Sequence, residues 1–525
     1  MVLGCSARYN KLEGKRERYL DRAREVSELT IPALLPPEGF TSSTDLYTPY
    51  QSVGARGVNN LASKLLMLLL PPNVPFFRLM PDNETSQELN NNPQVKAEVE
   101  SALSKIEREV MDEIEAQAIR VSVFEALKHL LITGNVLIHL PPTGALKIFP
   151  ITNYVCRRDP DGKILEIIVK EMVSREEMGG TTPLESQAAV DAQLSNSYSN
   201  TDAIPLFTKI VKVEDRYQVY QEIDDVILPD SYGEYPADSL PWMALRMVRV
   251  DGEDYGRSFC EEVHGDLKSL EALTQALVEF AAAASKLVFL VRPNATTRKS
   301  DLSDANNGDV VTGDANDVAV LQTNKYNDMR VVLDSVQRIE ERLKFVFLLN
   351  ESIQRKADRV TAEEIRFMAE QLEQSLSGVY SLLSVEFQLP LVSVLIKRMQ
   401  SKGQIPTLPK GAVRPVIVTG TAALGRGNDL QKLKSFLSDL IQLTGASPQS
   451  IQRINTGDLI KRLATGHGIE VEGLVRSEQE MAQLMQQMQQ QQMMQTAMVE
   501  GVKGAAGPAA KQMIESGGLS QNVES

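Results

Sequence analysis

The chain has 525 residues, of which 42% are hydrophobic, 24% charged and 5% aromatic. This composition is ordinary for a soluble globular protein of several domains, and the scarcity of aromatic side chains favours a helix-rich core of aliphatic residues. The formal net charge of −14 argues against a tight, non-specific nucleic-acid binder, whose affinity comes from Lys and Arg neutralising phosphates. It does not exclude a protein that touches DNA without holding it.

The three cysteines lie far apart and form no CxxC motif, so we expect no disulfide framework and a reducing, intracellular compartment. The first twenty residues carry Lys and Arg but no apolar stretch, so no secretory signal is expected. The most apolar run, Leu65–Leu70, is six residues long, whereas a bilayer span needs about 20 apolar residues. We therefore expect no membrane partner.

Helical periodicity runs through the first part of the chain. Opposite charges at i,i+4 spacing predict a solvated helix over residues 8–29, which prolines then end. Apolar residues at a period of 3.6 predict further helices over 54–70, 93–118 and 121–131. The apolar run Val136–Leu140 then predicts a strand.

Short β-rich segments separated by turn signals follow. The predicted strands are 146–151, 164–170, 207–213, 217–223 and 242–250. Between them, residues 179–203 are polar, and we expect an exposed insertion or a mobile loop there. Residues 213–234 carry seven acidic side chains against Arg216 alone, which indicates a solvated outer surface.

Two long helices flank a compact insert in the centre of the chain. Residues 266–287 have one continuous apolar face, and the apolar residues of 329–346 recur at alternating spacings of three and four, as in a heptad repeat. The insert between them is β-prone and is broken by Pro293 and Gly313. Because such a hairpin cannot bury both of its faces alone, it indicates neighbours in an assembly.

Helices are expected again after residue 360. Thr361 opens a capping box at the start of a helix that runs to near Pro390. A second helix is expected over 391–399, and residues 429–474 are mostly helical in pattern. The Gln- and Met-rich residues 476–525 predict a lone helix or a disordered tail. The expected fold class is therefore α+β and mainly helical.

The sequence offers no residue pattern that supports catalysis. Its four histidines have no metal-ligand spacing, and it contains no HExxH, GxSxG or GxxxxGK[ST] motif. The glycine-rich segment 420–432 follows no strong strand and lacks the Lys-Ser/Thr pair, so a helix-connecting turn is favoured over a nucleotide site. Paired carboxylates lie on polar segments, whereas a general acid or base needs a buried environment. We expect no enzyme, no metal and no cofactor.

A short basic run, Arg355, Lys356 and Arg359, lies at a predicted break between two strongly helical segments. Taken alone, it predicts a solvated loop. If copies of the chain ring an axis, one loop per subunit makes a mildly basic belt that faces a channel. Glu351 and Asp358 offset part of the charge, and exposed charges are screened within about 8 Å at physiological salt. Such a belt would grip DNA weakly, whereas many strong phosphate contacts would immobilise it.

Three further basic residues, Arg292, Arg298 and Lys299, lie in the central insert. One interpretation is that they meet a partner at one end of the assembly. The other is simple solvation, and the residues alone do not distinguish the two.

Five stretches of the chain carry a family resemblance. They are QSVGARGVNNLASKL (51–65), FEALKHLLITGNVLIHLP (124–141), RMVRVDGEDYGRS (246–258), RVTAEEIRFMAEQLEQSLSGVYSLLS (359–384) and GRGNDLQKL (425–433). They resemble, in the same order, the portal or head-to-tail connector proteins of podoviruses, the short-tailed bacteriophages. The resemblance spans residues 7–475 and is more specific than any single motif because its blocks are collinear. Residues 179–203 and the last fifty residues match poorly.

This resemblance implies a ring, typically of twelve copies, at one capsid vertex of the virion, assembled in the host cytoplasm. Viral double-stranded DNA would be packaged and later ejected through the central channel. The implied partners are the terminase packaging motor, tail adaptor or nozzle proteins, and capsid and scaffold proteins. No cofactor is implied, since a separate ATPase would supply the energy.

The resemblance also implies how the parts of a portal fold divide this sequence. The implied parts are a wing over 1–260 and 361–420, stem helices over 261–288 and 327–350, a clip over 289–326, a tunnel loop over 351–360, a crown over 421–475 and a low-complexity tail over 476–525. The basic run at 355–359 would then lie at the channel constriction. The three basic residues at 292–299 would lie in the clip, where the motor and the tail adaptor dock.

Two alternatives stay open at this point. One is a structural tail-adaptor or scaffold ring component without a DNA channel. The other is a nucleotide-dependent enzyme that uses residues 420–432.

Overall fold

The computed structural model describes residues 4–417 with gaps, all of them within the first of two compact units, 1–423 and 424–525. The gaps are residues 42, 73–74, 83–84, 88–92, 174–202, 229–230, 286–287, 294–296, 299, 301–302, 307–308, 322–325, 350–377 and 408–412. Several predicted features therefore lie outside the described residues. They are the 179–203 insertion except its last residue, the capping box at Thr361, the segment 420–432, the crown and the tail.

The N-terminal helices lie where helical periodicity predicts them. Their bounds are α1 Cys5–Glu28, α2 Val53–Leu69, α4 Pro93–Ala116 and α5 Ile119–Thr133. In α2 the leucines at the helical period, Leu61, Leu65 and Leu69, are fully buried, so the leucine face of the sequence is the core face of the helix. A short 3-10 turn, Pro32–Leu34, follows α1 where the prolines end it.

Two antiparallel sheets follow α5, one of three strands in the order β10-β2-β3 and one of six strands in the order β4-β5-β6-β7-β8, with β9 beside β7. The bounds are β2 Asn135–His139, β3 Lys147–Phe149, β4 Tyr154–Arg158, β5 Ile164–Val173, β6 Ile204–Val213, β7 Arg216–Ile223, β8 Val226–Ile227, β9 Gly233–Pro236 and β10 Trp242–Arg246. The predicted strands are confirmed, except that the one predicted over 242–250 ends as β10 at Arg246; β8 and β9 were not predicted. Strand β4 was missed because it is only five residues long and both of its faces are buried, Tyr154 in one apolar cluster and Val155 in another, so its residues do not alternate.

A separate two-stranded ribbon joins distant parts of the chain. Strand β1, Phe77–Pro81, pairs antiparallel with β13, Val413–Ile417. Neither strand was predicted, because each is short, contains a proline and finds its partner far along the sequence.

The helix Gly378–Ser401 corrects one prediction. We expected Pro390 to separate two helices, but the helix continues through it as a π-helical turn, Ser384–Gln388, followed by α13, Leu389–Ser401. The N–H of Leu389 bonds to the carbonyl of Ser384, five residues back, and this wider turn accommodates a proline that has no N–H to give. By length and composition the helix could span a membrane, but it packs into the protein core.

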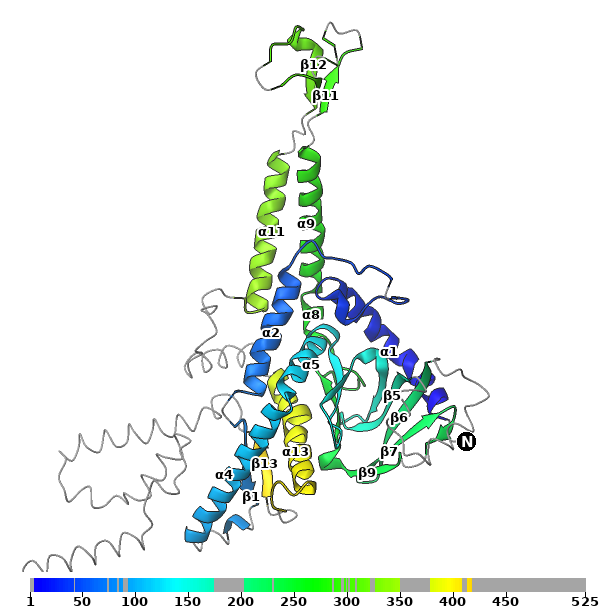
Figure 1. Ribbon diagram of the computed structural model, residues 1–525, viewed down its shortest axis with the longest axis vertical. Coiled ribbons are helices and arrows are strands. Elements are labelled where there is room, and N and C mark those ends of the chain that lie inside the picture. The colour runs from blue at the N-terminus through cyan, green and yellow to red at the C-terminus, as the bar shows by residue number, and fades with distance from the viewer. Residues whose placement is uncertain are drawn as a thin grey trace, which may run out of the picture. The chain divides into compact units, whose positions relative to one another are not determined.

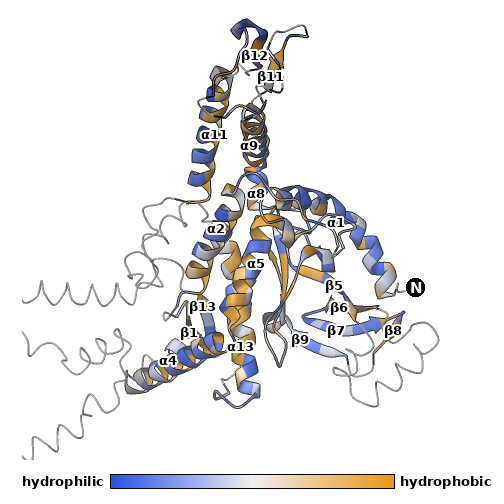
Figure 2. Ribbon diagram, turned by 45° about the horizontal axis from the view of Figure 1, so that its top comes forward, coloured by the Kyte–Doolittle hydropathy of each residue, from blue (hydrophilic) through white to orange (hydrophobic). Residues whose placement is uncertain are grey.

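The largest apolar cluster of the described residues lies between α2, α4, α5, strands β2 and β10, and the helix Gly378–Ser401. Figure 2 shows the hydrophobic colouring concentrated on α5, α13 and the adjacent strands. A second cluster lies between α1 and the sheets. Residues from before 150 and after 378 thus share one core.

The predicted helix–insert–helix hairpin is confirmed. The elements are α8 Phe259–Glu262, α9 His264–Ala284, β11 Val288–Val291, β12 Val318–Leu321 and α11 Tyr326–Val346. Helices α9 and α11 run side by side, and the paired strands β11 and β12 follow at the end where α9 finishes (Figure 1).

Candidate functional site

The α9–α11 hairpin leaves large apolar side chains exposed. Phe345 is 73% exposed, Val331 65% and Val278 49%. Val331 and Phe345 are two heptads apart and therefore lie on nearly the same side of α11. Within α9 only the first two turns contain buried residues, and none is buried beyond Glu271. These exposed apolar side chains are candidates for contact with another chain.

The seam between the two helices is narrow. Leu273 and Leu277 of α9 are partly buried in the same cluster as Val332 and Ile339 of α11. The ion pair between Arg342 and Asp266, at 2.7 Å, is exposed, and such pairs contribute about 0 to 1 kcal/mol. The first two turns of α9 are well packed, since Leu267 and Leu270 of α9 and Leu343 of α11 are fully buried, whereas no residue of α9 beyond Glu271 is buried.

The C-terminal end of α11 is held by α2. Leu348, just beyond the helix, has a left-handed backbone with φ of 52°, which costs a non-glycine residue about 1 to 2 kcal/mol. Asn60 donates to the carbonyls of Phe347 and Leu348 at 3.0 Å each, and Lys64 donates to that of Leu348 at 2.6 Å. The ring of Phe347 lies so close to Gly57 that a Cβ there would come within 2.4 Å of it. Three positions on one face of α2 thus fix the end of α11.

Among the α2 residues that contact the end of α11, Lys64 is the one that the sequence could have revealed. It interrupts the leucine face of α2 and is 9% exposed, and burial lowers the pKa of its ammonium group. A cation next to the last carbonyls of a helix is stabilised by the helix dipole. The signal in the sequence is a lysine among the leucines of an otherwise apolar helix face.

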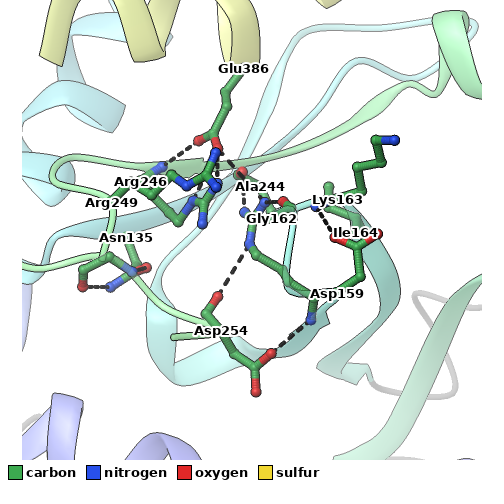
Figure 3. Close-up of polar contacts among 12 residues, drawn as sticks. Asn135, Asp159, Gly162, Lys163, Ile164, Ala244, Arg246, Arg249, Asp254 and Glu386 are labelled. Carbon is green, nitrogen blue, oxygen red and sulfur yellow. Dashed lines mark hydrogen bonds and ion pairs between the residues drawn. The ribbon is translucent and has the colours of Figure 1, made fainter. Parts of the chain in front are cut away.

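A buried charge cluster ties the π-turn to the two sheets (Figure 3). Arg246 of β10 donates to the Glu386 carboxylate through its guanidinium at 2.5 and 3.0 Å and through its backbone N–H at 3.1 Å. Arg158 of β4 lies 3.8 Å from the same carboxylate and also donates to the carbonyls of Gly162 and Ala244. The side chain of Arg246 is 3% exposed and that of Glu386 12%. Because a buried charge left unpaired is costly, this cluster holds the helix on the sheets.

Of the six basic residues predicted from the sequence, the structure describes Arg292 and Arg298. Arg292 and Arg298 are exposed in the insert that contains β11 and β12. The remaining predicted residues, Lys299, Arg355, Lys356 and Arg359, lie outside the described residues. Their roles stay predictions.

The described acidic residues of the segment 213–234 are exposed, as the sequence indicates, with the exception of Glu222. Glu222 is 5% exposed and accepts a hydrogen bond from the backbone N–H of Cys5 at 2.5 Å. It therefore satisfies a free N–H at the start of α1. An acidic residue read as surface is thus part of the packing of α1 on the sheet.

Neither the described histidines nor the cysteines form a reactive centre. Among the residues that the structure describes, no three His, Cys, Asp or Glu side chains are grouped as a metal site needs. His139 stacks on Trp242 with ring centroids 3.7 Å apart, and burial lowers its pKa to about 4. All three cysteines are free and buried, which agrees with the absence of a disulfide framework from the sequence.

Residues 4–475 match the family described as "Bacteriophage head to tail connecting protein". Over 488 residues the chain is 40% identical to the portal protein of Enterobacteria phage T3, covering 92% of this chain and 90% of the relative. Over 489 residues it is 40% identical to the portal protein of Escherichia phage T7, with the same coverage. It is also 30% identical over 479 residues to the portal protein of Enterobacteria phage SP6, covering 91% of this chain and 90% of that relative.

Proposed function

This chain belongs to the family of bacteriophage head to tail connecting proteins, and from that premise we propose how its parts act. It functions as a portal, the head-to-tail connector of a virion. The observation that carries this function is the 40% identity to two phage portal proteins over 92% of the chain. Its relatives are structural components, and we propose that it likewise has no catalytic site.

The active form that we propose is a closed ring, typically of twelve copies, at one capsid vertex. A closed ring needs a heterologous interface, in which one side of each subunit meets the other side of the next. The exposed apolar residues of the α9–α11 hairpin, Val278, Val331 and Phe345, supply such a side. No residue of α9 beyond Glu271 is buried, which supports the same idea, since a neighbouring copy would complete the packing of that part of the hairpin.

Double-stranded DNA would pass through the centre of this ring during packaging and ejection. The basic run Arg355, Lys356 and Arg359 would form a belt around the channel, one set from each subunit. The chain as a whole is acidic, with a formal net charge of −14, so the belt would touch DNA without clamping it. Transient contact suits a conduit in which DNA moves in both directions.

The insert between α9 and α11 would be the clip that docks partners. Arg292 and Arg298 are exposed there, and together with Lys299 they would meet the terminase motor during packaging and tail adaptor or nozzle proteins afterwards. The wing, over 1–260 and 361–420, would face capsid and scaffold proteins during assembly in the host cytoplasm. The shared core of residues before 150 and after 378 supports a wing built from both stretches.

An in vitro packaging assay tests the function directly. Capsids assembled with this chain should take up DNA when the motor and ATP are added, and capsids assembled without it should not. Equal uptake with and without the chain would refute the portal function. A structural adaptor ring without a channel would join capsids to tails but leave uptake unchanged, and ATP hydrolysis by the isolated chain would favour an enzyme instead.

The belt has its own test. The variant with Arg355, Lys356 and Arg359 changed to Ala should form rings but package or retain less DNA. The matched control changes three exposed lysines elsewhere, Lys11, Lys15 and Lys163, to Ala, which alters the net charge equally. If both triple variants retain DNA as the unmodified chain does, the belt proposal fails.

A further inference from the structure

Helix α2 contacts the described chain on both sides of the gap 350–377. On the near side, Asn60 and Lys64 bind the carbonyls of Phe347 and Leu348 at the end of α11. On the far side, Gln388 of the π-turn binds the last residue of α2. No other function assigned above uses these contacts.

The contact of Gln388 is a helix-end contact of the same kind. Its Nε2 donates to the carbonyl of Leu69 at 2.7 Å, and Gln388 is fully buried. Leu69 ends α2, so its carbonyl is one of those that a helix leaves without an internal partner. The Gln388 Oε1 makes no hydrogen bond with the described residues, so the side chain is held by its amide nitrogen alone.

The two contacts are set apart by a rigid spacer. Asn60 and Leu69 lie nine positions apart on one continuous helix, which at 1.5 Å per residue separates them by about 13 Å. Leu61 and Leu65, between them, are fully buried in the largest cluster. Because these side chains fix α2 in the core, α2 cannot bend or slide without opening that core.

We propose that α2 is a strut that holds the end of α11 and the helix Gly378–Ser401 at a fixed separation. Asn60, Lys64 and Gln388 are its positioning residues. The inference rests on the proposed function, because the chain between these two helices is the part that we propose to touch DNA. Force from moving DNA would then enter the core through α2 and would not unwind the last turn of α11.

The burial of the partners supports a positioning role. Phe347 and Leu348 are 0% and 7% exposed, so their carbonyls have little access to water. Leu348 is held in a left-handed conformation that leucine rarely adopts, which persists only where the surroundings impose it. The donors on α2 supply that constraint.

Variants of matched shape without donors test the strut. The double variant Asn60→Leu, Lys64→Met removes both donors from the end of α11, and Gln388→Met removes the donor to α2. The controls are Asn59→Leu with Lys11→Met, and Gln400→Met; Asn59 is the exposed neighbour of Asn60 and Lys11 is exposed on α1. If the double variant fails to assemble, the single changes Asn60→Leu and Lys64→Met, each of which leaves one donor to Leu348, replace it.

Amide hydrogen exchange rates of the assembled full chain test each of the two contacts separately. Residues 343–349 should exchange about tenfold faster or more in the double variant, since a buried carbonyl left without a donor is costly. Residues 378–389 should do so in Gln388→Met. Exchange at the rates of the matched controls would overturn the proposal, because the contacts would then hold nothing.

DNA retention in filled capsids separates positioning from simple stability. Both donor-free variants should form rings yet retain several-fold less DNA than their controls. Faster exchange with unchanged retention would also overturn the proposal, since the contacts would then be local packing only. If the unmodified chain retains no DNA, the proposed function fails, while the exchange rates still decide whether α2 holds the two helices.

Discussion

Replacing Phe345 with alanine tests whether the exposed side of the hairpin joins neighbouring subunits. The side chain is 73% exposed in the single chain, so of about 200 Å² on a phenylalanine, about 150 Å² would leave water at an interface. At about 25 cal/mol per Å², this burial is worth about 3 to 4 kcal/mol for each interface. Because the ring is solvated in the free subunit, Phe345→Ala should leave the folding of that subunit unchanged.

The assay is the protein concentration at which rings form, followed by sedimentation velocity. A loss of about 3 kcal/mol should raise this concentration by about two orders of magnitude. Val121→Ala is the control, because Val121 is 71% exposed on α5, outside the hairpin, and it should assemble as the unmodified chain does. Ring formation by Phe345→Ala at an unchanged concentration would refute the idea that a neighbour covers this side.

Three further predictions concern stability and reactivity. Glu386→Ala should lower the free energy of unfolding by about 3 to 5 kcal/mol, because it leaves the buried Arg246 unpaired; urea unfolding measures this, and Glu341→Ala at an exposed site should change little. The three cysteines should resist a thiol reagent at pH 8 until the chain unfolds, since burial raises the pKa of each, that of Cys5 to about 12; a thiol that reacts in the folded chain would contradict this. His139, whose pKa burial lowers to about 4, stays neutral in the fold while the unfolded chain binds a proton near pH 6.5. Stability should therefore fall by up to about 3 kcal/mol as the pH drops from 6.5 towards 4, and His139→Phe should flatten that fall in urea titrations at several pH values.

Local periodicity predicted the elements that are covered on one side only. The helices α9 and α11 lie half in water, so their apolar stripes stand out from the polar residues between them. Strands β5 and β6 were predicted although both of their faces are buried, Ile167 in one apolar cluster and Ile168 in another, because these strands are long and rich in β-branched residues. Prediction thus worked for helices with one apolar face and for long β-rich strands.

Elements fixed by distant partners were not predictable in this way. The ribbon of β1 and β13 depends on a pairing between residues near 80 and residues near 415, which no local pattern contains. The continuity of the helix through Pro390 depends on the π-turn just before it, in which the N–H of Leu389 bonds to the carbonyl of Ser384. From the sequence, a proline shows only that one backbone N–H is missing. It does not show whether a wider turn will let the helix continue.

The functional residues also divide into those visible in the local sequence and those that depend on distant partners. The basic run at 355–359 was found because charge is visible in a sequence, and its role still depends on how copies surround an axis. The hydrogen bonds from Asn60 and Lys64 to the carbonyl of Leu348 were missed. The spacing of residues within α2 does not show which distant residue a donor on that helix will contact. The charge cluster around Glu386 was missed for the same reason, since its arginines come from two different strands.

Electron microscopy of the purified full chain tests the central claim most directly. A portal that conducts DNA should appear as closed rings with an axial hole, and the number of copies can be counted in the end-on view. Monomers, open chains or solid particles without a hole would contradict the account.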